Sequence, residues 1–324
     1  MITRKKAGKS FYYFDDGYKI TDASVIERID KLAIPPAWSK VEVAGSARSK
    51  IQAKGYDAAG RLQSIYSPSF RIKQDAQKFE RILRFADALP ALRRQVDKDL
   101  SRRKLSKDKV LACVVKLIDD EFFRVGNEQY ARDHSSYGIT TLRSKHATIT
   151  NTTVTFDFIG KSGQSHIKKI KNPKIARIIK QLDEMPGYEI FRYIDESSQV
   201  HDLHSKDVNE YIKRYAGDDF TAKDFRTWGG TLLATSALLA AELEENESKT
   251  ARQKRISSVV KQVAKRLGNT PAIARSSYID PRVFTSLEDP NAIPKLQEAI
   301  SEMRPKKYMT VEEQCVLKLL AVKA

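Results

Sequence analysis

The chain has 324 residues, of which 41% are hydrophobic and 31% charged, as expected of a globular protein that can build sizeable cores. Its 58 lysines and arginines exceed its 41 aspartates and glutamates, and the formal net charge of +17 predicts a polyanionic partner, with a merely solvated basic surface as the alternative. The sequence argues against a membrane or secreted protein, because it has no apolar run of spanning length and no apolar segment after its charged N-terminus. Two cysteines, Cys113 and Cys315, are too few for a disulfide framework or zinc cluster, and we expect both to be buried in a reducing compartment.

Short alternating runs predict a β-rich region at the start of the chain. A strand over 11–14 precedes an Asp-Asp-Gly turn, another is expected over 38–43, and residues 50–66 form a hairpin that turns at 57–60. The solvent-exposed face of this hairpin could bind a nucleic acid, with its cations on the phosphates and its glutamines on base edges. The candidate side chains are Gln52, Lys54, Tyr56, Arg61 and Gln63. A solvated sheet without a partner explains the same pattern equally well.

Helical periodicity replaces the strand pattern from Asp75 onward, and Pro90 is expected to interrupt the helix. We place a domain boundary at this proline, to within about ten residues. The expected domains are therefore a β-rich one over 1–90 and a larger one over 91–324.

A second helix is expected to begin at a cap around Ser106 and to run to Phe122. It leads into Arg124, which lies beside two aromatic residues and a glycine. Such an arginine is often an ordinary surface residue at a helix end. The sharper interpretation is a fixed phosphate clamp.

Residues 146–170 alternate in the manner of a three-stranded antiparallel meander with Lys161 at the tip of its second turn. The triplet at 160–162 imitates the end of a phosphate-binding P-loop. That motif needs a glycine where Thr155 stands and a helix afterwards, so we reject nucleoside triphosphate binding. A tip lysine is usually solvated, but a hairpin can also carry one into an active site.

Helices are expected over 173–183, 205–216 and 250–267, and another opens near residue 218 and continues to Leu239. Arg226 lies in the first turns of that helix, between two aromatic residues. The acidic residues 242–247 are expected to form a solvated helix end or loop. His201 and His204 are two potential metal ligands, but no third cluster accompanies them, so no metal site is expected.

The stretch 267–281 ends one helix at Gly268 and places Tyr278 nine residues after Asn269. An ordinary helix-turn-helix corner would have this pattern. Spaced arginines and a turn lysine elsewhere in the chain are the groups that a tyrosine needs to attack a phosphodiester. Our hypothesis is that Tyr278 is a nucleophile.

Taken together, these motifs resemble the type IB DNA topoisomerases, in the compact form found in bacteria and poxviruses. The resemblance covers nearly the whole chain, and its motifs occur in the family's order with compatible spacing. The segments that carry it are Ile34–Trp38, Ile51–Asp57 with Gly60-Arg61, Phe123–Gly126, Gly160-Lys161, Phe220–Trp228 and Asn269–Pro271 with Tyr278. It implies an α+β fold, a two-domain clamp with a small β-rich N-terminal cap and a larger, mainly helical catalytic domain that holds a small three-stranded antiparallel sheet.

The resemblance also assigns roles to residues. It makes Tyr278 the nucleophile, Arg124 and Arg226 the two catalytic arginines, and Lys161 the general acid of the hairpin. Asn269 stands where poxviral enzymes carry a histidine that donates to a phosphate oxygen; an amide can still donate but cannot be a cation.

Further DNA contacts are implied at Tyr66 and Tyr130, which match family tyrosines, and we add Arg275, which precedes the nucleophile. Ser64 stands where poxviral enzymes have a tyrosine, so their strict target-sequence preference is not expected here.

The implied activity is relaxation of supercoiled duplex DNA through a 3′-phosphotyrosyl intermediate, strand rotation and religation. No ATP, metal or nucleotide cofactor is expected, and the protein is expected to act as a monomer in the cytoplasm, at the nucleoid. A tyrosine recombinase shares the arginine, lysine and tyrosine chemistry, but residues 1–90 look like the topoisomerase cap. A non-catalytic duplex-DNA-binding protein suits the charge equally well and leaves Lys161, Arg226 and Tyr278 unexplained.

Overall fold

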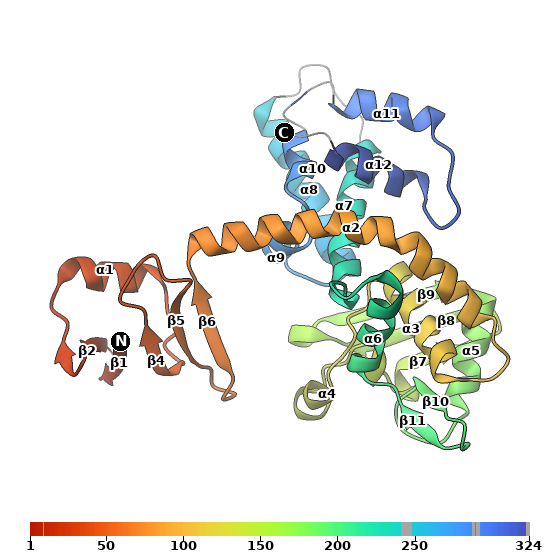
Figure 1. Cartoon of the computed structure of the whole chain (residues 1–324), viewed down its shortest axis with the longest axis horizontal. Helices are drawn as coiled ribbons and strands as arrows, with labels where there is room; N and C mark the ends of the chain where they lie inside the picture. Colours follow the sequence, from red (N-terminus) through yellow and green to blue (C-terminus); the bar gives the residue numbers. More distant parts are fainter. Residues whose placement is uncertain (9, 241–247, 287–288, 290–291, 322–324) are drawn as a thin grey trace. The chain divides into compact units, whose positions relative to one another are not determined.

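The computed structural model describes residues 1–8, 10–240, 248–286, 289 and 292–321. It has an α+β architecture, as the sequence predicts, and divides into two compact units, Met1–Phe79 and Glu80–Ala324 (Figure 1). The acidic segment expected at 242–247 lies outside the described residues.

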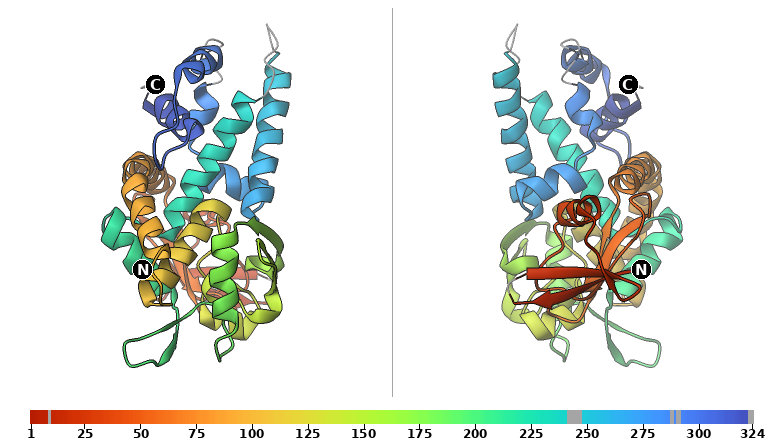
Figure 2. Two further views of the ribbon diagram at one scale, coloured as in Figure 1. Left: turned by 90° about the vertical axis from the view of Figure 1, so that its right-hand side faces the viewer. Right: turned by 90° about the vertical axis from the view of Figure 1, so that its left-hand side faces the viewer.

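The first unit is a six-stranded antiparallel sheet with one helix on one of its faces. The sheet order is β3-β2-β1-β4-β5-β6, and Ile29 of the helix is fully buried in one apolar cluster with Ile2, Val43 and Ala53 of the strands. Figure 2 shows the helix beside the sheet. The expected strands and hairpin are confirmed. The elements are β1 Ile2–Ala7, β2 Ser10–Asp15, β3 Tyr18–Lys19, α1 Ala23–Lys31, β4 Ser39–Val43, β5 Ile51–Tyr56 and β6 Leu62–Tyr66.

Helix α2, Pro68–Leu100, runs from the first unit into the second without the break expected at Pro90. A proline inside a helix removes one hydrogen bond and crowds the preceding turn, which disfavours the helix by about 3 kcal/mol. Here Phe85, Leu89 and Leu92 are at most 1% exposed, so burial of one apolar stripe offsets that cost. The division between the two units falls within α2, after Phe79, whereas we predicted a boundary near residue 90.

The second unit is mainly helical, and α3 and α7 contribute many of its buried side chains. The three-stranded meander is confirmed, as are the helices at 173–183 and 205–216, and both cysteines are buried. The helices are α3 Lys107–Glu121, α4 Glu128–His134, α5 Pro173–Asp183, α6 Ser205–Ala216, α7 Ala222–Leu239, α8 Lys249–Leu267, α9 Pro271–Ser277, α10 Arg282–Thr285, α11 Ala292–Glu302 and α12 Val311–Ala321. The strands are β7 Ala147–Ile149, β8 Thr153–Ile159 and β9 Ser165–Lys171 in one sheet, and β10 Arg192–Ile194 with β11 Val200–Asp202.

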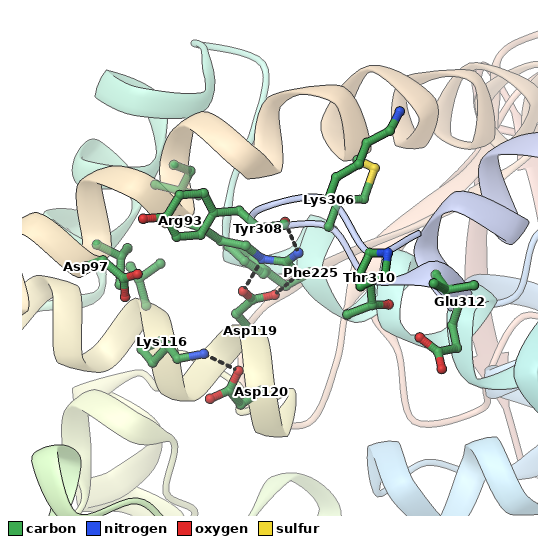
Figure 3. A pocket seen from close by; sticks show the side chains of 16 residues that line it. Arg93, Asp97, Lys116, Asp119, Asp120, Phe225, Lys306, Tyr308, Thr310 and Glu312 are labelled. Carbon is green, nitrogen blue, oxygen red and sulfur yellow. Dashed lines mark hydrogen bonds and ion pairs between the residues drawn. The ribbon is translucent and has the colours of Figure 1, made fainter. Parts of the chain in front are cut away.

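Arg93 ties three helices of this unit together at the edge of a cavity of about 540 Å³ (Figure 3). From α2 it donates Nε to Asp119 on α3 at 2.7 Å, and Nη2 to Glu313 on α12 at 2.7 Å. The side chains of Asp119 and Glu313 are only 8% and 2% exposed. Each of these carboxylates therefore depends on the guanidinium for its charge compensation.

Substituting Arg93 by methionine is expected to lower the free energy of unfolding of this unit by about 3–5 kcal/mol, because it leaves buried charges without a partner. Urea unfolding followed by circular dichroism measures the loss. The matched control on the same helix is Arg84→Ala, whose partner Asp219 is exposed, and which should cost no more than about 1 kcal/mol. Equal effects of the two substitutions would contradict this account of the cluster.

Candidate active site

Arg124 is held by a fixed segment of backbone that follows the end of α3. Phe122 ends that helix in the left-handed conformation, with φ 55° and ψ 37°. The Arg124 carbonyl then accepts from the Ile139 N–H at 2.8 Å, and the neighbouring backbone runs so close that a Cβ on Gly138 would lie 2.5 Å from Gly126. These contacts hold the backbone that carries Arg124 in place.

Arg226 lies in the first turns of α7 and is 4% exposed. Its Nη1 donates to the Phe122 carbonyl at 2.6 Å, and its Nη2 donates to the Leu267 carbonyl at 2.8 Å. These carbonyls belong to the C-terminal ends of α3 and α8, where the helix dipoles favour a cation. Among the described residues no carboxylate pairs with Arg226, so its charge remains available to an anionic substrate.

The corner between α8 and α9 places Asn269 and Tyr278 at opposite ends of a short helix. Gly268 ends α8 with φ 60°, a conformation that favours glycine. Thr270 caps α9 by accepting from the Ile273 N–H at 3.3 Å, and Pro271 is its first residue. The two helical turns of α9 therefore set the separation between Asn269 and Tyr278.

The Asn269 amide has a determined orientation and an unpaired donor nitrogen. Its Oδ1 accepts from Arg124 Nη2 at 2.5 Å, and the same Nη2 donates to the Gly268 carbonyl at 2.8 Å. Because a guanidinium can only donate, the amide nitrogen must point the other way. That Nδ2 is buried and has no hydrogen-bond partner within the described part of the chain. An unsatisfied buried donor is costly and is suited to an acceptor supplied by a ligand.

The phenol of Tyr278 lies within the field of three cations. Burial opposes its ionisation most strongly, but Arg226, then Arg124 and Lys223, outweigh burial and lower the pKa of Tyr278 below its usual 10. The guanidinium carbon of Arg226 lies 5.0 Å from the centroid of the phenol ring. Burial and the neighbouring Arg226 in turn lower the pKa of Arg124 to about 10, which still leaves it charged at neutral pH.

A cavity of about 580 Å³ brings the predicted catalytic residues together. Lys161 reaches it from the turn between β8 and β9, where its side chain is exposed. The charged and polar residues that line the cavity include Arg124, Lys161, Lys223, Arg226, Asn269 and Tyr278. All five of the predicted catalytic side chains thus face one space.

Lys223 is a member of this set that the sequence interpretation missed. It is exposed in the first turn of α7. The signal was its position three residues before Arg226, because residues three apart share one face of a helix.

The predicted nucleic-acid contacts of the first unit separate into two groups. Lys54, Tyr56 and Tyr66 point away from the face that α1 covers; both tyrosines are 39% exposed, and Lys54 pairs with Glu42 at 3.0 Å. Gln52, by contrast, is 3% exposed. Its amide donates to the carbonyls of Ser46, Ala47 and Ser49 and accepts from Arg28 at 3.1 Å. Gln52 therefore organises a loop and does not present its amide to solvent, contrary to our expectation.

The remaining predicted contacts lie in different surroundings. Arg61 and Gln63 both donate to the Asp57 carboxylate, at 2.9 and 3.0 Å, and so stabilise the hairpin turn. Tyr130 is 38% exposed on α4. Arg275 is exposed on α9, with its guanidinium carbon 4.7 Å from the Phe284 ring centroid, and it lines another cavity than Tyr278 does.

The two histidines considered as metal ligands pair instead with carboxylates. His201 contacts Asp195 at 2.7 Å, and His204 contacts Glu128. Within the described residues no three histidine, cysteine or acidic side chains gather in a metal-binding group, and no helix there is long and apolar enough to cross a membrane.

Two family models match the chain. One, described as the catalytic core of eukaryotic DNA topoisomerase I, matches residues 67–307, and the other, described as the N-terminal domain of bacterial DNA topoisomerase IB, matches residues 10–57. The chain is 36% identical over 285 residues to DNA topoisomerase 1B of Acanthamoeba polyphaga mimivirus. The matched region covers 86% of this chain and 84% of the viral one. It is 23% identical over 240 residues to DNA topoisomerase 1B of Vaccinia virus (strain Copenhagen), covering 73% and 72% of the two chains.

Proposed function

Since this chain belongs to the type IB DNA topoisomerases, we propose that it relaxes supercoiled duplex DNA with Tyr278 as the nucleophile that cuts one strand. The observation that carries the proposal is the half-buried Tyr278 phenol beside two arginines that no carboxylate neutralises within the described residues. A free phenol has a pKa near 10 and is a weak nucleophile at neutral pH. The arginines both favour the phenolate and offer donors to the phosphate that it attacks.

In the first chemical step Tyr278 gives its phenol proton to solvent, its oxygen forms a bond to phosphorus, and the bond from phosphorus to the 5′ oxygen breaks. Negative charge grows on the non-bridging oxygens, and Arg124, Arg226 and the free Asn269 Nδ2 are the groups that would donate to them. The departing 5′ oxygen takes a proton from the Lys161 ammonium, and the tyrosine keeps the 3′ phosphate. Rotation of the cut strand about the intact one releases supercoils, and the reverse reaction reseals the break.

Relaxation is expected to proceed in EDTA and without ATP. The phosphotyrosyl bond conserves the energy of the broken phosphodiester, and arginine and lysine side chains supply the positive charge at phosphorus. A plasmid relaxation assay with and without EDTA, Mg²⁺ and ATP measures this. A strict requirement for the metal or the nucleotide would contradict the mechanism.

We propose that DNA contacts of the first unit come from Lys54, Tyr56 and Tyr66, with further contacts from Tyr130 and Arg275 in the second unit. Lys54 can exchange its partner Glu42 for a phosphate. The exposed tyrosines offer both an apolar face and a hydroxyl group to the DNA backbone.

Lys54→Ala is expected to weaken binding to all duplex sequences alike and to reduce the slope of log affinity against log salt by about 1. Fluorescence anisotropy over a salt series measures both quantities. The control is Lys31→Ala on α1, an exposed lysine paired with Glu27. An unchanged slope for Lys54→Ala would remove this residue from the contact surface.

We further propose that the protein acts as a monomer, at the nucleoid of a bacterial cytoplasm. The bacterial N-terminal family match supports the bacterial setting, and one chain supplies every residue of the proposed site.

A further inference from the structure

His166 lies between the two backbone segments that carry Lys161 and Asn269. It belongs to β9, and its ring stacks on Phe158 with the centroids 5.2 Å apart. A Cβ on Gly160 would lie 2.7 Å from the imidazole Cδ2, and a Cβ on Gly268 would lie 2.0 Å from its Cε1. The imidazole therefore fills the space against both glycines.

Each of these glycines directly precedes a proposed catalytic residue. Gly160 precedes Lys161 in the turn of the β8–β9 hairpin, and Gly268 precedes Asn269 at the end of α8. Because protein interiors are close-packed and resist compression, a rigid ring between two backbone segments sets their separation. His166 is thus a spacer between the two sides of the cavity.

The imidazole does not line the cavity that holds Tyr278. It lines a small neighbouring void, together with Phe158, Lys168 and Arg226, and Arg226 lines both spaces. Burial, and then the nearby cations Lys168, Arg124 and Arg226, lower the pKa of His166 to about 4. The ring is therefore neutral at physiological pH and adds no charge to this cationic region.

The two sides that the ring separates are not equally fixed. The Gly268 N–H donates to the Lys265 carbonyl at 3.2 Å, and its carbonyl accepts from Arg124 at 2.8 Å, so the end of α8 is held independently of His166. The Gly160 N–H bonds within its own hairpin, to the Gln164 carbonyl at 2.8 Å. The neighbouring bond to another segment, from the Tyr137 N–H to the Ile159 carbonyl at 2.8 Å, holds the strand before Gly160 and not the turn after it. Loss of the ring should therefore release the Lys161 turn before it disturbs Asn269.

We propose that His166 is a positioning residue that holds the Lys161 turn at a fixed separation from the Asn269 end of α8. The proposal rests on the function proposed above, in which Lys161 protonates the leaving 5′ oxygen. It adds that the placement of this acid depends on a side chain that lies outside the Tyr278 cavity.

The first test is His166→Ala in the full-length protein, with single-turnover cleavage of a duplex as the readout. Cleavage of the normal phosphodiester is expected to slow about 10–100-fold, a part of the 10²–10⁴-fold that positioned proton transfer contributes. A substrate with sulfur at the bridging 5′ position should recover most of this loss, since a thiolate leaves without a proton. Duplex affinity should stay within about twofold. The control His201→Ala removes a half-exposed side chain of β11 that pairs with Asp195, and it should cleave both substrates normally.

A general folding defect would slow both substrates alike, and that result would overturn the proposal. Normal cleavage of the phosphodiester by His166→Ala would also overturn it. Failure of the wild-type protein to form any covalent adduct would instead refute the proposed function itself.

The second test approaches the same contact from the other side. Gly160 has φ −101°, which alanine can adopt, so Gly160→Ala acts mainly by pressing its methyl group on the imidazole. It should slow cleavage with the same sulfur rescue. In the double variant with His166→Ala the methyl group has space, so the double variant should cleave no more slowly than His166→Ala alone. Multiplication of the two single effects would show that they are independent and would overturn the proposal.

Discussion

Tyr278→Phe is expected to abolish the covalent protein–DNA adduct while leaving duplex affinity within about twofold of the wild type. The substitution removes only the attacking oxygen, and loss of a nucleophile in a comparable covalent mechanism costs on the order of 10⁶-fold in rate. The ring itself should stay in place, because its backbone N–H bonds the Ala274 carbonyl at 3.1 Å and its carbonyl packs against Gly230. Denaturing electrophoresis of an end-labelled duplex measures the adduct, and anisotropy measures the affinity.

The matched control is Tyr130→Phe, which removes one hydroxyl from an exposed tyrosine of the same unit. It should still form the adduct, at a rate reduced only by the loss of one contact to the DNA backbone. A denaturant-stable adduct in Tyr278→Phe would assign the nucleophile to another residue.

The pH profile of cleavage follows from the same geometry. The reactive form is the phenolate, so the rate rises with pH and levels off above the pKa of Tyr278. Because Arg226 and Arg124 lower that pKa below 10, the plateau should begin at a lower pH than for a free phenol. Removing the charge in Arg226→Ala should move the midpoint upward as well as slow the reaction, since burial would then dominate.

Where local chemistry decides the structure, the sequence is a reliable guide. Asn172 accepts from the backbone N–H groups of Lys174 and Ile175, and Pro173 follows it, so the start of α5 can be predicted from these residues alone. For Arg124, Lys161 and Tyr278 it is the resemblance to the family that predicts a shared site, and all three line one cavity.

Where distant segments decide the structure, local patterns mislead. Pro90 looked like a helix end, but packing of α2 against the second unit keeps the helix intact. Gln52 alternated like a surface residue, but the bulge in β5 and the loop at 46–49 enclose its amide. The role of His166 depends on two glycines far apart in the chain, and no local signal brings Gly160 and Gly268 together.

Lys161→Ala is the variant that separates proton transfer from every other contribution of the site. Lys161 is exposed on a turn and lines the Tyr278 cavity, so its removal leaves the packing, the arginine pair and the Asn269 donor in place. Cleavage of the phosphodiester should fall 10²–10⁴-fold, because an alkoxide is a poor leaving group without an acid. A 5′-bridging sulfur should return the rate to near that of the wild type on the same substrate.

The matched control is Lys223→Ala, which removes a second exposed cation of the same cavity but one that acts on the phenol through its field. If Lys223 contributes charge alone, its loss should slow cleavage of both substrates by a similar factor and sulfur should not rescue it. Each variant removes one positive charge from the cavity, so comparing them distinguishes the loss of a proton donor from the loss of a charge. If sulfur does not rescue Lys161→Ala, Lys161 is not the general acid. If sulfur rescues Lys223→Ala instead, Lys223 is the general acid.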